Sequence, residues 1–160
     1  MSVRLLALDP GITTGYAIFQ VPDNQTLFAV LLEFGTIEYN DLEKKLWDII
    51  ERHVQKGLQL PFDVVVAEAF PPKVMYSRKL AEVQYILYKI FLTGDRPGHT
   101  RFTRVFKWIQ PGEWKGEPLP NLPASAEGGP RAKAGPRVRH IKDAYHIGYW
   151  YLKKYYKALV

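Results

Sequence analysis

Residues 5–19 read LLALDPGITTGYAIF, an apolar run that ends at Asp9, a Pro-Gly turn and a second apolar run. Residues 3–8 are apolar except for one arginine, which is the pattern of a strand buried on both faces of a sheet. Proline at position 10 fixes its own φ angle and the glycine after it permits a tight reversal, so residues 15–19 are predicted to return as a second strand. The stretch therefore predicts a hairpin with a carboxylate at the end of its first strand.

The remaining elements follow from the spacing of apolar residues along the chain. Strands have β-branched or alternating patterns, and helices have apolar residues three and four positions apart. The first three predicted strands form an antiparallel meander. A helix from Asn40 or Asp41 to Gly57 connects this meander to a strand that ends in Glu68. The further predicted elements are strands at 27–34, 63–67 and 102–107 and helices at 77–91 and 138–156.

This order of elements predicts an α/β fold in which strands 1–3 are antiparallel and strands 4 and 5 are reached by parallel crossovers. A chain of 160 residues is long enough for one well-buried core, so we expect a single domain over 1–160. Residues 110–136 are rich in Pro, Gly, Ala and Ser without periodicity, and they are predicted to form a long mobile loop.

Composition restricts the setting in which the protein works. Hydrophobic residues make up 47% of the chain and charged residues 24%, and no apolar run has the length of a membrane span. The absence of cysteine excludes disulfides, thiolate metal sites and a cysteine nucleophile. The first residues lack the features of a secretory signal, so a cytoplasmic location without membrane association is expected.

Positive charge is concentrated in the last third of the chain. Residues 101–160 carry twelve Lys and Arg against four Asp and Glu, whereas residues 1–100 carry ten against twelve. This asymmetry indicates a polyanionic partner, first of all nucleic acid, although a merely solvated basic surface would give the same count.

Two carboxylates end predicted strands, and two further polar residues lie on the last helix. Asp9 and Glu68 each follow an apolar run, so they meet at one edge of the sheet if their strands are parallel neighbours. Two adjacent carboxylates repel each other, and a bridging divalent cation relieves this repulsion. His140 and Asp143 are three positions apart and share one helix face.

Carboxylate oxygens with one imidazole and no thiolate suit Mg²⁺, or Mn²⁺ as a substitute, better than Zn²⁺. Two such ions can activate a water and stabilise the leaving oxygen in phosphodiester hydrolysis. Each residue also has an ordinary alternative: Asp9 could initiate a turn, Glu68 could be a surface residue at a strand end, and His140 and Asp143 could face solvent.

Four stretches resemble the RuvC-type Holliday-junction resolvases of the RNase H-like nuclease superfamily. They are ALDPGITTGYAIF, VVVAEAF, the helix containing KLAEVQYIL and HIKDAYHIGYWYL, in the order of that family. The resemblance implies an RNase H-like sheet and a homodimeric, Mg²⁺-dependent endonuclease with two ions per active site. Its substrate would be a branched DNA, a four-way junction cut by paired nicks, and no nucleotide cofactor is expected.

The resemblance also assigns roles to particular residues. Asp9, Glu68 and Asp143 match the metal-binding carboxylates of the family, and His140 matches a position that is Asp or His among its members. The helix at 77–91 is similar to the one that forms the dimer interface. The residues expected to contact DNA are an aromatic or apolar group near the junction, Phe70, Met75 or Tyr76, and the basic residues Lys115, Lys133, Arg137, Arg139 and Lys142.

The sequence departs from the family pattern in two places. The last helix is bulkier than usual, and the segment PGEWKGEPLPNLPASAEGGPRAK stands where a shorter basic loop is common. These departures indicate a divergent member, such as one from a bacteriophage. Three other functions remain open: a flap or transposase-like nuclease, an actin-like phosphate-binding domain, and a DNA-binding module without catalysis.

Overall fold

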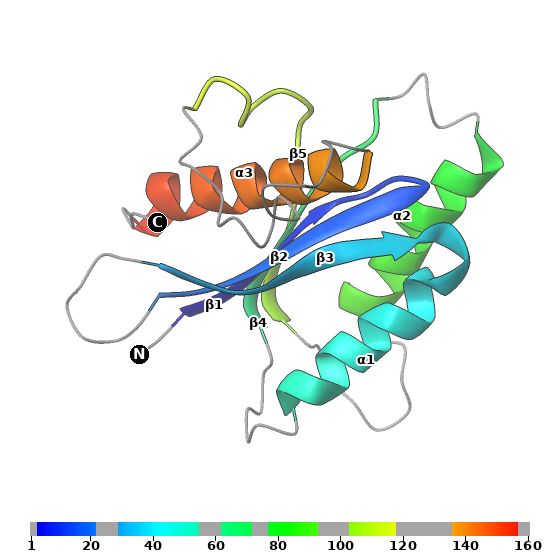
Figure 1. Ribbon diagram of the computed structural model, residues 1–160, viewed down its shortest axis with the longest axis horizontal. Helices are drawn as coiled ribbons and strands as arrows, with labels where there is room; N and C mark the ends of the chain where they lie inside the picture. The colour runs from blue at the N-terminus through cyan, green and yellow to red at the C-terminus, as the bar shows by residue number, and fades with distance from the viewer. Residues whose placement is uncertain are drawn as a thin grey trace, which may run out of the picture.

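The structure is a computed structural model that describes residues 3–21, 29–54, 62–71, 77–92, 103–117 and 136–156. A five-stranded sheet has the order β3-β2-β1-β4-β5 (Figure 1). Strands β1 to β3 are antiparallel, and β4 and β5 are parallel to β1, which confirms the predicted mixed sheet. The elements are β1 (Val3–Asp9), β2 (Thr13–Val21), β3 (Val30–Glu38), α1 (Leu42–Val54), β4 (Phe62–Glu68), α2 (Arg78–Phe91), β5 (Thr103–Ile109) and α3 (Pro136–Tyr156).

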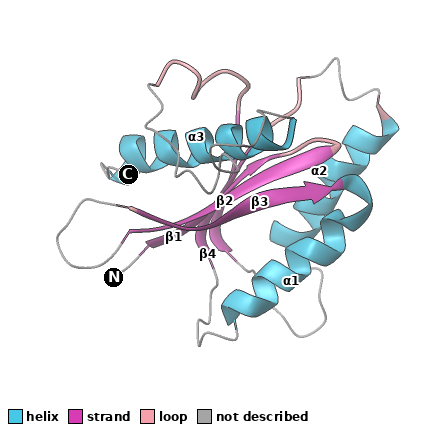
Figure 2. Cartoon of the chain, viewed as in Figure 1, coloured by secondary structure: helices cyan, strands magenta, loops and turns pink. Residues whose placement is uncertain are grey.

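Helices cover both faces of the sheet, with α3 on one face and α1 and α2 on the other (Figures 1 and 2). The side chains of β1 alternate between these layers, as the pleat of a strand requires. Leu5 and Ala7 belong to the core under α3, and Leu6 and Leu8 belong to the core under α1 and α2. All four are fully buried, so β1 is the central strand that its continuous apolar run predicts.

Two glycines allow α3 to lie directly on the hairpin of β1 and β2. A Cβ atom on Gly15 would come within 2.0 Å of the carbonyl oxygen of His140, and one on Gly148 would come within 2.3 Å of the Phe19 ring. No side chain fits at either distance. The close approach at Gly15 places the first turns of α3 beside the end of β1, where Asp9 lies.

Several predicted boundaries are corrected by the structure. The third strand runs over Val30–Glu38 instead of 27–34, because its last residues pair with the start of β2 even though Gly35 and Thr36 interrupt the apolar pattern. Residues 27 and 28 lie outside the described ranges. In place of a cap at Asn40 or Asp41, a short 3-10 turn over Tyr39–Asp41 leads into α1. Ser77 does cap α2, since its Oγ accepts a hydrogen bond from the Leu80 amide.

The segment that follows β5 begins with ordered turns. Residues 110–117 form successive turns, and the Trp114 side chain is only 3% exposed within the core under α3. The rest of the expected loop, residues 118–135, lies outside the described residues. Among the described helices, none is long and apolar enough to cross a membrane.

Candidate active site

Three carboxylates come together at the edge of the sheet where β1 and β4 end. Leu8 pairs with Ala67 in the parallel register of these strands, so the residues that follow them, Asp9 and Glu68, lie side by side. Asp143 comes from α3, and its charge raises the pKa of both strand carboxylates. Three elements that are distant in sequence therefore each contribute one acidic group, which we call the Asp9–Glu68–Asp143 cluster.

His140 contacts this cluster directly. Its Nδ1 atom lies 3.0 Å from Asp9 Oδ2, and because a carboxylate only accepts, Nδ1 is the donor. The side chain of Asp9 is 14% exposed and that of His140 is 21% exposed. The two predicted residues, 131 positions apart, thus form a partly buried hydrogen-bonded pair.

Burial disfavours the ionised forms of all three carboxyls, and repulsion from neighbouring carboxylates adds to this effect for Asp9 and Glu68. The pKa of Asp9 is raised to about 6, mainly by burial; the charges of Asp143 and Glu68 also raise it, while His140 lowers it. Burial is also the main cause of the raised pKa of Glu68 and of Asp143, and Lys115 lowers the pKa of each. The positive charges near the cluster therefore do not offset the effect of its burial on these pKa values.

The donor set of the cluster fits a hard divalent cation. Carboxylate oxygens and an imidazole are ligands that Mg²⁺ and Mn²⁺ accept, and added positive charge would stabilise the disfavoured ionised forms. Asp9 is engaged by His140, however, and Glu68 by the Trp114 indole. Within the described part of the chain, no three Asp, Glu or His side chains already form a metal-binding group. The types of side chain in the cluster therefore suit the ion, but their positions in this structure do not form a ready metal site.

The residues predicted to contact DNA have different environments. Lys115 and Arg139 are exposed, and each lowers the pKa of Asp143, which places both cations near the cluster. Lys142 is half-buried on α3. Phe70 is also half-buried and packs against the core under α1 and α2. Met75, Tyr76, Lys133 and the side chain of Arg137 lie outside what the structure describes.

Trp114 and His146 are not among the predicted site residues, yet both border the cluster. The Trp114 indole donates a hydrogen bond to Glu68 Oε2, and its ring meets the His146 ring edge to face at 4.9 Å between centroids. A single tryptophan within a segment rich in Pro and Gly is the only sequence signal of this contact. His146 follows Asp143 by three positions, and that spacing alone places it near the same helix face.

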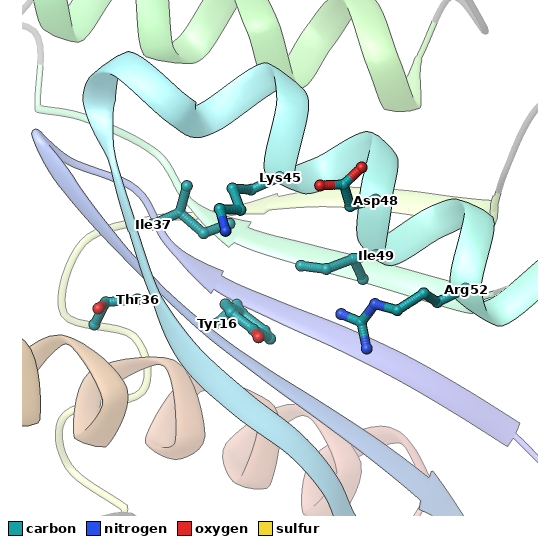
Figure 3. A pocket seen from close by; sticks show the side chains of 7 residues that line it. All are labelled: Tyr16, Thr36, Ile37, Lys45, Asp48, Ile49 and Arg52. Atoms are coloured by element: carbon teal, nitrogen blue, oxygen red, sulfur yellow. The ribbon is translucent and has the colours of Figure 1, made fainter.

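A polar pocket lies on the opposite face of the sheet, between α1 and the strands β2 and β3 (Figure 3). Its volume is about 240 Å³. Tyr16 lines it and packs against the core under α1 and α2, whereas Asp9 points toward α3. The pocket is therefore separated from the acidic cluster by the sheet. Its lining residues are Tyr16, Thr36, Ile37, Lys45, Asp48, Ile49 and Arg52.

No protein-family model and no curated protein matches this sequence. Solved structures do match: RuvC of Thermus thermophilus in complex with a Holliday junction substrate has a TM-score of 0.51 at 17% identity, covering 95% of this chain and 94% of that one. A second Thermus thermophilus RuvC structure has a TM-score of 0.53 at 16% identity, covering 98% of both chains. The yeast mitochondrial Holliday junction resolvase has a TM-score of 0.59 at 10% identity, covering 97% of this chain and 82% of that one. The chain therefore has the RNase H-like fold of these resolvases, which the sequence predicts.

Proposed function

We propose that this protein is a divalent-metal-dependent endonuclease that resolves four-way DNA junctions by paired nicks. The observation that carries the proposal is the cluster of three partly buried carboxylates, contributed by β1, β4 and α3 at one edge of the sheet. One solved structure of the same fold contains a Holliday junction substrate, which supports this class of DNA.

Asp9, Glu68, Asp143 and His140 would hold the metal ions, and Asp9 is the ligand that we propose for both of them. When bound, two Mg²⁺ or Mn²⁺ ions supply the activation of a water and the stabilisation of the leaving oxygen. His140 orients the Asp9 carboxylate through Oδ2, as groups beside a metal ligand commonly do. Its imidazole can also exchange a proton at the margin of the site.

Basic residues around the cluster are proposed to hold the DNA backbone. Lys115 and Arg139 lie near enough to lower the pKa of Asp143, and Lys142, Lys133 and Arg137 are proposed for the same role from their positions in the sequence. Further along α3, Lys154 lies over the ring of Tyr155, and Lys107 of β5 contacts the same tyrosine. Such basic and aromatic surfaces suit nucleic acid, whose phosphates and bases they can both contact.

The proposed active assembly is a homodimer that pairs two cleavage sites. On α2, Tyr85 is 60% exposed and Tyr88 is 49% exposed, beside a hollow of about 230 Å³ that Trp108 of β5 also lines. Exposed aromatic side chains around a hollow are typical of a surface that binds another protein. Sedimentation of the wild type and of Tyr85→Glu tests this: we expect a dimer that the added charge dissociates.

The proposed function is tested by incubating the purified protein with a synthetic four-way junction, a flap and a linear duplex. We expect symmetric nicks in the junction with Mg²⁺ and no cleavage with a chelator. Equal cleavage of the flap would identify a broader branched-DNA nuclease, and cleavage in the chelator would contradict the metal mechanism.

A further inference from the structure

The turns at 110–117 fold back onto one of the proposed metal ligands. The Trp114 indole N–H donates to Oε2 of Glu68, and the Gly112 backbone amide also stabilises the Glu68 carboxylate. Trp114 is 3% exposed, so this contact is shielded from water. A segment with no regular structure therefore supplies two hydrogen-bond donors to a carboxylate at the end of β4.

Local hydrogen bonds give these turns a defined shape. Backbone amides of Glu113, Lys115 and Glu117 each bond the carbonyl three residues earlier, at 3.2 Å. The Glu113 carboxylate accepts a hydrogen bond from the Gln110 amide at 2.8 Å. Gly112 has a φ of +90°, a conformation that favours glycine over residues with a side chain. The position of the indole is thus fixed by the backbone that carries it.

The same turns are fastened to α3. The ring Nε2 of His146 lies 2.6 Å from the Glu117 carbonyl oxygen and donates to it. Lys153 forms an ion pair with the Glu117 carboxylate. Trp114 therefore lies between Glu68 on β4 and the helix that carries Asp143, and it contacts both elements.

We propose that Trp114 is a positioning residue that orients the Glu68 carboxylate for metal binding. The inference rests on the proposed function, because it takes Glu68 as a metal ligand. The indole holds Oε2 and, with the Gly112 amide, restricts how the Glu68 carboxylate can turn toward an ion. Hydrogen bonds to ligating carboxylates commonly fix the ligand in this way, and their loss weakens metal binding about 10- to 100-fold.

The first test is fluorine NMR of the DNA-free protein labelled with 5-fluorotryptophan. The chain has four tryptophans, and the Trp114 signal is assigned by replacing Trp47, Trp108 and Trp150 one at a time with phenylalanine. On addition of MgCl₂ we expect the Trp114 signal to shift most, since its indole bonds a ligand of the ion. An unchanged Trp114 signal at Mg²⁺ concentrations that support cleavage would overturn the proposal.

The second test compares Trp114→Phe with Trp47→Phe, a matched loss of an indole on α1. Phenylalanine keeps an aromatic ring but cannot donate to Glu68, so we expect calorimetry to show Mg²⁺ binding about 10-fold weaker in Trp114→Phe only. Thermal unfolding without metal checks that each variant is folded; if Trp114→Phe is not, the NMR result decides. Equal or tighter Mg²⁺ binding by folded Trp114→Phe would refute the positioning role alone, whereas a wild type that neither binds nor uses Mg²⁺ would refute the proposed function as well.

Discussion

Glu33 and the Asp9–Glu68–Asp143 cluster are partly buried on opposite faces of the sheet, and their partners differ. On the α1 face, both Glu33 oxygens accept hydrogen bonds from the Arg52 guanidinium at 2.8 Å, and Oε2 also accepts one from the Tyr16 hydroxyl at 2.9 Å. Arg52 is the main cause of the lowered pKa of Glu33. On the α3 face, burial raises the pKa of all three carboxyls in the Asp9–Glu68–Asp143 cluster, and repulsion from neighbouring carboxylates raises it further for Asp9 and Glu68.

The difference in partners indicates that Glu33 contributes to stability, whereas the acidic cluster has the features of a binding site. Glu33 is neutralised by a cation of the chain itself, in the bidentate geometry that is strongest for arginine and carboxylate. In the acidic cluster, by contrast, the hydrogen-bond partner of Asp9 is the His140 imidazole and that of Glu68 is the Trp114 indole. A group of charges that burial disfavours is typical of a functional site.

The largest expected effect comes from Asp9→Asn. Removing a shared ligand costs several kcal/mol of transition-state stabilisation, so cleavage of the junction should fall by about 1,000-fold. Binding of the junction in a gel-shift assay should be nearly unchanged. Glu33→Gln is the control on the other face and should cleave normally; cleavage by Asp9→Asn at the wild-type rate would contradict the assigned role of Asp9.

Stability should depend on pH in opposite ways for the two groups. The pKa of Asp9 is raised from 3.8 to about 6, so the folded state holds its proton more tightly, and the Asp9 contribution to stability falls as pH rises through that window. In chelator, Asp9→Asn should therefore gain stability over the wild type between pH 4 and pH 7, by at most ~3 kcal/mol. Glu33 has a lowered pKa, so its contribution is present at neutral pH and is lost in acid.

Thermal unfolding of the two proteins across this pH range measures the difference. Added Mg²⁺ at pH 7 should reduce the difference, because only the wild type has the Asp9 carboxylate for the ion to stabilise. A constant difference from pH 4 to pH 7 would show that the Asp9 carboxyl titrates normally.

Removing the Glu33 carboxylate should lower the free energy of unfolding by about 1–2 kcal/mol, since Arg52 and Tyr16 lose a charged acceptor. Urea denaturation of Glu33→Gln measures this. Glu43→Gln is the matched control, because Glu43 is 44% exposed in its ion pair with Lys89 and such surface pairs contribute about 0–1 kcal/mol. An equal loss of unfolding free energy in both variants would mean that the Glu33 interactions contribute no more to stability than an ordinary surface ion pair.

The smallest expected effect concerns Lys115, whose charge lowers the pKa of Glu68 and Asp143. If Lys115 neutralises one phosphate, Lys115→Gln should reduce the slope of log affinity against log salt concentration by about 0.9. Lys44→Gln, an exposed substitution on α1, should leave the slope unchanged. The same slope in both variants would mean that Lys115 serves the carboxylates and not the DNA.

The sequence predicts the central part of the fold and site well, because its signals are local. The apolar runs before Asp9 and Glu68 identify two buried strands, and their common edge follows from a parallel register. The third strand is displaced from its predicted range because pairing with β2 overrides the weak pattern around Gly35. Edge-strand boundaries depend on partners that no local window contains.

Contacts between distant segments could not be predicted in the same way. Trp114 lies 46 positions from Glu68, in a stretch whose composition indicates only a loop. His53 and Arg4 are 49 positions apart and bond at 2.8 Å, although neither belongs to a recognisable motif. Such pairs depend on how the layers pack, which periodicity does not encode.

The hydrogen bond between Asp9 and His140 also constrains the order of events during synthesis. Asp9 leaves the ribosome long before His140, since 131 positions separate them. A nascent chain that ends with β5 has Asp9 and Glu68 but neither His140 nor Asp143. Until α3 has been translated, the nascent chain therefore lacks half of the proposed metal ligands. The proposed nuclease activity would begin only after synthesis of this last helix.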